Sequence, residues 1–180
     1  MTGDLGGLAG ADARCQRLAK AAGAGDKTWR AYLSAERTSE SDQTPVNARD
    51  RIGDGPWHNA DGKLLAKDVA ALHALPSGNA DLFLDENGDK INGQWAGSPT
   101  PNEHDILTGS KADGTVMADM TCDSWTSDSA DTAAQVGHSD AASLPGLTSW
   151  WNSVHESASC TQEGLAERLG SGRIYCFAIR

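Results

Sequence analysis

Apolar positions near the start of the chain recur at helical spacing. Between residues 9 and 22 they form one stripe, made up of Ala11, Cys15, Leu18, Ala19 and Ala22. This period predicts a helix over 9–22. Asp12 would then lie in the first turn, where the helix dipole favours an acidic side chain, and Gly23 would end the helix.

Shorter patterns predict the remaining regular elements. Thr28–Leu33 alternates apolar and polar residues, and the chain closes with a run of strand-forming residues over 173–179. Both patterns are typical of strands. Residues 67–75 predict a short helix in which His73 is a packed histidine and not a metal ligand. The acidic turn 85–89, between two short apolar stretches, indicates a hairpin.

Residues 95–160 show little periodicity. They are rich in Gly, Ser, Asp, Asn and Thr, and they include two of the four cysteines. A structureless stretch of this length is uncommon unless it is functional or crosslinked. We therefore expect a long ordered loop region that is held by a disulfide bridge.

Composition narrows the class of protein. The chain has 180 residues with a net charge of −10 and a mean hydropathy of −0.48. No apolar run is long enough to span a membrane, and so acidic a surface is repelled by nucleic acid. Length predicts a single domain over residues 1–180, and the many glycines with few Phe and Tyr indicate a loop-rich protein and exclude a helical bundle. Of the six tryptophans, we expect Trp29 and Trp125 in the core, while Trp57, Trp95, Trp150 and Trp151 could stack on sugar rings.

The four cysteines are widely separated and form no C-x-x-C pair. An even number of widely separated cysteines favours two disulfides in an oxidising compartment, and the alternative is four buried thiols in a cytosolic protein. Spacing alone leaves all three pairings open. No signal segment is visible, so we expect a mature or trimmed form of a secreted protein.

Several stretches resemble the endostatin-like branch of the C-type lectin-like fold. They are Gly7–Cys15, Trp29–Ser34, Cys122–Trp125 and Ile174–Phe177. The chain is still more similar to uncharacterised bacterial secreted or lipoprotein domains of this type, which share its Gly-rich opening and its Leu-Asp-Glu-Asn-Gly turn. The resemblance implies the α+β class, with a mixed, mostly antiparallel sheet, one or two helices and a long loop region.

The resemblance also implies the disulfides Cys15–Cys176 and Cys122–Cys160, and a secreted, periplasmic or cell-surface location. Domains of this type begin with a strand that pairs with the terminal strand. Here almost nothing precedes Thr2. Either the terminal strand is an exposed edge or another chain supplies its partner, which allows a homodimer through this strand.

Sugar-binding lectins of this fold hold calcium through an acidic Pro-Asn motif and a later Trp-Asn-Asp motif. The corresponding stretches here are Thr100–Glu103 and Trp151–Ser153. They give the candidate ligand-binding residues Asn102, Glu103, Trp151 and Asn152. Thr100 and Ser153 replace two carboxylates, which should weaken or abolish calcium binding because calcium prefers such oxygen ligands.

A second group of candidates combines imidazoles with carboxylates. His104 and Asp105 are adjacent, His138 precedes Asp140 by two positions, and His155 follows later. Imidazoles beside carboxylates suit a metal site or a general acid–base pair. If the loops converge, all five residues are candidate metal ligands. The alternative is that the histidines hydrogen-bond the loop backbone.

These observations give two main functional expectations. The first is a non-catalytic extracellular or periplasmic module that binds a carbohydrate or protein ligand with its long loop region. The second is a metal-dependent hydrolase for esters or lactones, in which His138, His155 and Asp140 carry catalysis; no standard catalytic motif is present. A third is a purely structural surface domain. The cofactor, if there is one, would be a single divalent ion, calcium or zinc.

Overall fold

The computed structural model describes residues 1–75, 77–141 and 150–179. Its helices are α1 (Gly7–Ala21), α2 (Val69–His73), α3 (Cys122–Trp125) and α4 (Gln162–Glu167), with a 3-10 turn at Ala48–Asp50. Its strands are β1 (Thr28–Ala31), β2 (Trp57–His58), β3 (Leu64–Ala66), β4 (Asp105–Leu107), β5 (Gln135–His138), β6 (His155–Glu156), β7 (Gly170–Ile174) and β8 (Cys176–Ile179). The fold is α+β, as the resemblance implies, with few helices and small sheets.

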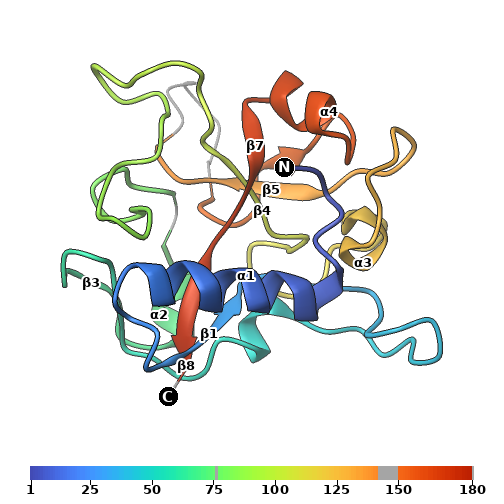
Figure 1. Cartoon of the computed structure of the whole chain (residues 1–180), viewed down its shortest axis with the longest axis horizontal. Coiled ribbons are helices and arrows are strands. Elements are labelled where there is room, and N and C mark those ends of the chain that lie inside the picture. Colours follow the sequence, from blue (N-terminus) through green and yellow to red (C-terminus); the bar gives the residue numbers. More distant parts are fainter. Residues whose placement is uncertain (76, 142–149, 180) are drawn as a thin grey trace.

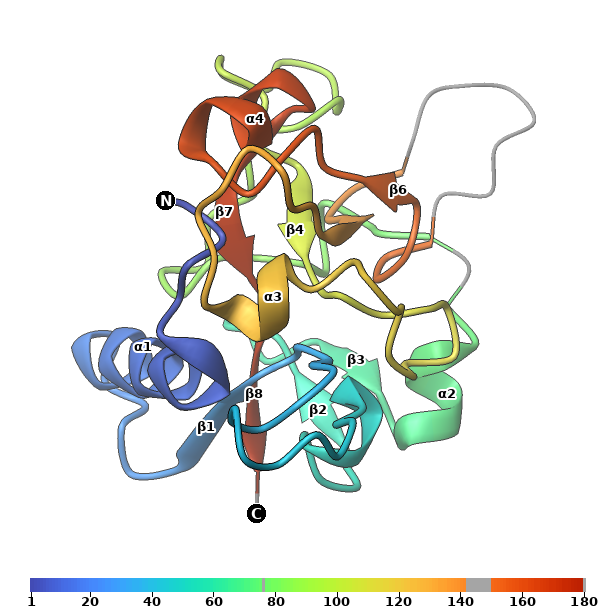
Figure 2. The ribbon, with the colours of Figure 1, turned by 90° about the vertical axis from the view of Figure 1, so that its right-hand side faces the viewer.

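The strands form three sheets. The largest has the order β6-β5-β4-β7, in which β4 and β7 are parallel and the other neighbours are antiparallel. β1 pairs with β8, and β2 with β3. Figures 1 and 2 together show that β7 and β8 run on from one another and pass behind α1 in the view of Figure 1. The chain segment 170–179 therefore links the large sheet to the helical half of the molecule.

The first helix follows its apolar stripe. Ala11, Cys15 and Ala19 are its buried residues, and Gly23 follows it with a positive φ of 79°, as predicted. The helix begins two residues earlier than the sequence indicates, so the expectation that Asp12 lies in the first turn is wrong. Both carboxylate oxygens of Asp12 instead accept hydrogen bonds from Arg51 Nη2, at 2.8 and 2.7 Å, and thereby tie the helix to the segment after β1.

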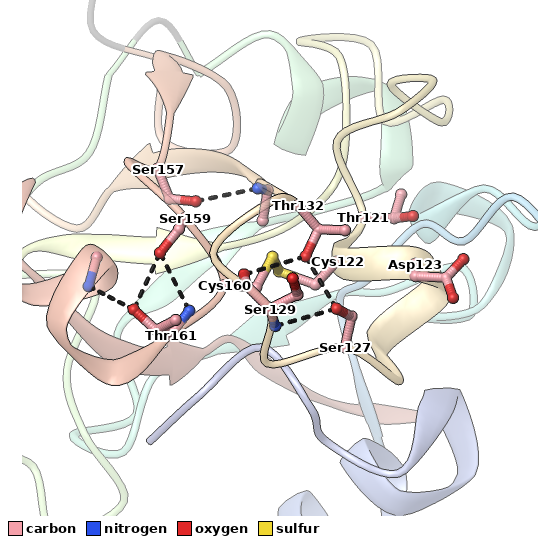
Figure 3. Close-up of a disulfide and its surroundings, with 12 residues drawn as sticks. Thr121, Cys122, Asp123, Ser127, Ser129, Thr132, Ser157, Ser159, Cys160 and Thr161 are labelled. Carbon is pink, nitrogen blue, oxygen red and sulfur yellow. Dashed lines mark hydrogen bonds between the residues drawn. A yellow bond between two sulfur atoms is a disulfide. The ribbon is translucent and has the colours of Figure 1, made fainter.

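Two disulfides crosslink the domain, and they are the pairs that the resemblance implies. Cys15–Cys176 joins α1 to β8, and Cys122–Cys160 joins α3 to the segment before α4. Figure 3 shows the second bridge among serine and threonine side chains. α3 is a left-handed turn, since its four residues have φ between 46° and 70°, and it buries the indole of Trp125 completely.

The region 95–160 is more regular than its pattern indicates. It contributes β4, β5 and β6, three of the four strands of the main sheet (Figure 2). All residues of β4 and β5 are buried. Strands buried on both faces do not alternate apolar and polar residues, and these are only three and four residues long, so periodicity gives no signal.

Other expectations need smaller corrections. The strand predicted over 173–179 is interrupted at Tyr175, and its two halves pair with different partners. The hairpin around residues 85–89 is reduced to a single bridge between Leu84 and Lys90. His73 is packed as predicted: one ring nitrogen contacts the Val69 carbonyl and the other the Tyr32 hydroxyl.

The disulfides indicate folding in an oxidising compartment. In the described part of the chain, no helix has the length and apolar character that crossing a membrane requires. The homodimer through the terminal strand stays a prediction. Within the described residues, β8 has β1 as its strand partner.

Candidate metal centre

The main sheet brings three of the candidate residues together by its register. Asp105 opens β4 and lies opposite His138, the last residue of β5. His155 opens β6 and lies opposite Val136, two residues from His138 on the same face of β5. Diagonal neighbours of this kind are within reach of long side chains. His104 immediately precedes β4, and its ring stacks on that of His138 with centroids 4.2 Å apart.

Three imidazole nitrogens surround one carboxylate. Asp105 Oδ1 lies 3.4 Å from His104 Nε2 and 3.1 Å from His138 Nε2. Asp105 Oδ2 lies 3.6 Å from His155 Nε2, and the Nε2 atoms of His138 and His155 are 3.1 Å apart. His104, Asp105 and His138 form a buried group whose ligand atoms are close enough to hold one metal ion.

The carboxylate of Asp105 is in an unusual position for a charged group. The residue is only 2% exposed, and neither of its oxygens accepts a hydrogen bond from any of the described residues. The nearby imidazole nitrogens form ion pairs with it only where a ring is protonated, and burying a carboxylate without such a partner costs several kcal/mol. A cation between the carboxylate and the three rings would remove this cost.

Hydrogen bonds behind two of the rings fix their tautomers. His104 Nδ1 lies 2.6 Å from Asp140 Oδ1, and His155 Nδ1 lies 2.9 Å from the carbonyl of Glu156. Both partners are acceptors, so each Nδ1 carries the proton and donates it. The Nε2 atoms of His104 and His155 then keep their lone pairs, which is the form that binds metals.

Asp140 accepts a hydrogen bond from His104 Nδ1, on the side of the ring away from Asp105, and does not belong to the group of possible metal ligands around Asp105. Burial on its own would raise the pKa of Asp140, but hydrogen bonds from His104 and from the backbone N–H of Gln94 hold that pKa below its ordinary value. The prediction that Asp140 is a metal ligand is therefore wrong here. The proposed catalytic set of His138, His155 and Asp140 is not assembled either, because the Asp140 carboxylate is bound to His104.

The backbone at Gly93 and Gln94 encloses the Asp140 carboxylate. Gln94 donates its backbone N–H to Asp140 Oδ2. A Cβ atom at Gly93 would overlap Oδ2 and lie 2.9 Å from Cγ of Asp140. Sequence reasoning missed Gly93 and Gln94, which carry no signal of their role because their contact with Asp140 is made by backbone alone.

The candidates from the calcium motif lie elsewhere. Trp151 and Asn152 are fully buried: the Trp151 indole N–H donates to the Leu72 carbonyl, and the Asn152 amide donates to Tyr32 Oη. The prediction that these two residues bind a ligand is wrong, because both are part of the core. Asn102 and Glu103 are partly exposed.

The polar side chains of Asn102 and Glu103, from the first of the two calcium motifs, already have partners within the protein. Asn102 Oδ1 accepts the backbone N–H of His104 at 3.0 Å. Glu103 pairs with Arg173, with 2.6 Å between Oε2 and Nη2. Both side chains therefore hold the entry to β4 in place. They flank the candidate metal cluster, and Trp151 and Asn152 are buried in the core instead.

The four tryptophans that could stack on sugar rings differ in their exposure. Trp57 and Trp151 are buried, while Trp95 and Trp150 are partly exposed. Trp125 is buried as predicted, and Trp29 packs against the same core cluster.

Comparisons of the sequence with known proteins do not assign this chain to a family. No protein-family model matches the chain, and a search of curated proteins finds no match.

Proposed function

We propose that this chain is a non-catalytic, extracellular-type binding module whose loop face is organised by one zinc-class ion. The ion would be held by His104, Asp105, His138 and His155. The observation that carries this proposal is the buried group of His104, Asp105 and His138, whose donor atoms are close enough to hold one ion, with His155 beside it. The alternative of a metal-dependent hydrolase differs from it in one respect that can be tested, which is whether the ion keeps an open position.

Part of the spacing fits tetrahedral coordination. Zinc binds imidazole nitrogen at about 2.0–2.1 Å, and the edge of the corresponding tetrahedron is about 3.3 Å. Asp105 Oδ1 lies 3.4 Å from His104 Nε2 and 3.1 Å from His138 Nε2, and these three residues can hold one ion together. His155 Nε2 lies 3.1 Å from His138 Nε2 but outside this group, so its ring would have to shift toward the ion to complete the tetrahedron.

A cluster without metal explains the geometry less well. A hydrogen bond between the His138 and His155 rings would satisfy those two nitrogens. It would leave the buried carboxylate of Asp105 without a hydrogen-bond partner among the described residues, and its contacts with the imidazole nitrogens are ion pairs only where a ring is protonated. A bound cation accounts for all four groups together.

The donor types favour zinc over calcium. Three imidazoles with one carboxylate form a set that suits zinc and similar transition metals, whereas calcium requires six to eight oxygen ligands. The hydrogen bond from His104 to Asp140 supports the same assignment, since histidine ligands usually donate their second N–H to a carboxylate or carbonyl.

Four protein ligands fill a tetrahedral zinc site, which is the arrangement of structural centres; catalytic centres keep one position for water. Such an ion would crosslink β4, β5 and β6. In the hydrolase alternative His155, whose side chain is 33% exposed, would have to leave the ion to admit water. The nearness of His155 to His138 supports a closed set and hence the structural role, whereas His104, Asp105 and His138 alone would leave one position open.

A cavity of about 540 Å³ beside the centre is our candidate for the ligand surface. Phe83, Gln94, Trp95 and Asp140 line it, and Asp140 also accepts a hydrogen bond from His104. The partly exposed indole of Trp95 offers a broad apolar face of the kind that stacks on a sugar ring. This cavity supports a carbohydrate as the ligand of the proposed module.

The test is elemental analysis of the purified protein with thermal unfolding measured before and after chelation. We expect about one zinc per chain. At free zinc 100-fold above the dissociation constant, the ion adds about 2.7 kcal/mol, so chelation should lower Tm by about 5–10 °C. His138→Ala should abolish zinc binding. His58→Ala, which removes an exposed histidine outside the cluster, should not.

The other outcomes have distinct meanings. Absence of metal together with an unchanged Tm in chelator would overturn the proposal. Turnover of ester or lactone substrates that is lost both on chelation and in His138→Ala would establish the hydrolase in place of the binding module. Zinc binding without turnover on such a screen supports the module.

A further inference from the structure

A second cavity, of about 400 Å³, lies between the N-terminal segment and α1. Figure 1 shows this segment descending from the N-terminus to the start of the helix. The residues that line the cavity and matter for its chemistry are Thr2, Asp4, Leu5, Gly10, Arg14 and Arg17. None of them belongs to the metal centre, so the inference below is independent of the proposed function.

The spacing of the helix residues explains why they share this cavity. Gly10, Arg14 and Arg17 recur at helical intervals of four and three residues, which places them on one face of α1. Ala11 and Cys15 point into the core instead. A Cβ atom at Gly10 would overlap the Leu5 carbonyl oxygen, so the segment passes directly over the helix at this point.

Arg14 lines this cavity, is partly buried and forms no ion pair with the described residues. Its Nη1 atom is buried and has no hydrogen-bond partner among them. Arg17, one turn further on, has the same charge. Burial and, to a lesser extent, Arg17 lower the pKa of Arg14, yet a guanidinium stays charged at any physiological pH.

The absence of a partner is notable in so acidic a protein. The chain has 25 acidic residues and a net charge of −10. Arg37, Arg51 and Arg173 each pair with a carboxylate at 2.6–2.7 Å. No such pair forms with Arg14 or Arg17 in the described ranges, although Asp4 lines the same cavity. Asp4 Oδ1 instead accepts the backbone N–H of Gly6.

We propose that this cavity binds a small oxyanion, a phosphate or carboxylate group, between Arg14 and Arg17. The planar fork of an arginine matches both groups with two parallel hydrogen bonds. The Thr2 hydroxyl lines the same space and can donate a further hydrogen bond. The carboxylate of Asp4 lies at the cavity wall and limits the affinity by repulsion.

The test is calorimetric titration of the folded, disulfide-bonded protein with inorganic phosphate and, separately, with acetate at constant ionic strength. We expect saturable binding of at least one of them, and the stronger of the two identifies the preferred group. Arg14→Gln should weaken binding at least tenfold. Arg30→Gln, which removes an exposed arginine from β1, should leave it unchanged.

A variant that does not remove a cation keeps the test decisive if Arg14→Gln fails to fold. Asp4→Asn retains the acceptor for Gly6 but removes the negative charge. At about 5 Å in a water-like medium, this should tighten binding about fourfold. The proposal is overturned if neither anion binds, or if Arg14→Gln and Arg30→Gln bind equally well, since binding would then be at another site such as the metal centre.

Discussion

Replacing Gly93 by alanine should weaken metal binding although Gly93 is not a ligand. The φ of Gly93 is outside the positive range that favours glycine, so alanine is acceptable to the backbone. The conflict is steric: the new Cβ would overlap Asp140 Oδ2 and lie 2.9 Å from Cγ, where ordinary contact begins at 3.4 Å. Either the turn or the carboxylate must move.

The size of the effect follows from the hydrogen bonds at risk. The bond from His104 Nδ1 to Asp140 Oδ1 is 2.6 Å long, and a displacement of about 1 Å takes it beyond hydrogen-bond range. Loss of such an orienting partner typically costs 10–100-fold in metal affinity. We therefore expect zinc affinity to fall by that factor, or about 1.4–2.8 kcal/mol.

The assay is competition for zinc with a chromophoric chelator, with the metal-free Tm measured alongside. Ala96→Ser, in the same exposed turn, is the matched control and should bind zinc as the wild type does. Asp140→Asn should resemble Gly93→Ala because an amide cannot accept from both His104 and Gln94. Wild-type zinc affinity in both variants would refute the role given to Asp140.

Further predictions concern stability. Burial holds the pKa of His73 below its ordinary value, so the unfolded chain binds this proton more readily. The free energy of unfolding should therefore fall as the pH drops from about 6.5 through the folded pKa, and urea titrations between pH 5 and 8 should show a smaller fall in His73→Gln. Replacing both cysteines of a bridge by alanine should cost about 5 kcal/mol for Cys15–Cys176 and about 4 kcal/mol for Cys122–Cys160, since they span 161 and 38 positions. Denaturant unfolding without reductant measures this, and equal or reversed costs would contradict the loop-entropy argument.

Local signals in the sequence were sufficient for some features. The apolar stripe of α1 and its glycine stop are properties of neighbouring residues, and the structure has both. The imidazole–carboxylate pairs identified the three residues of the candidate metal group and the neighbouring His155, because the chemistry of a ligand is visible in its residue type alone. The acidic composition and the even number of cysteines likewise need no tertiary information.

The tertiary structure decided which candidates meet. Asp105 and His138 become neighbours only through the register of β4 and β5, two short buried strands without a periodic pattern. The same long-range pairing placed Asp140 behind His104 and moved Trp151 into the core. The sequence by itself determined the inventory of ligands and crosslinks. Their geometry depended on contacts between segments far apart in the chain, because pairing and burial are properties of the assembled fold and not of any one segment.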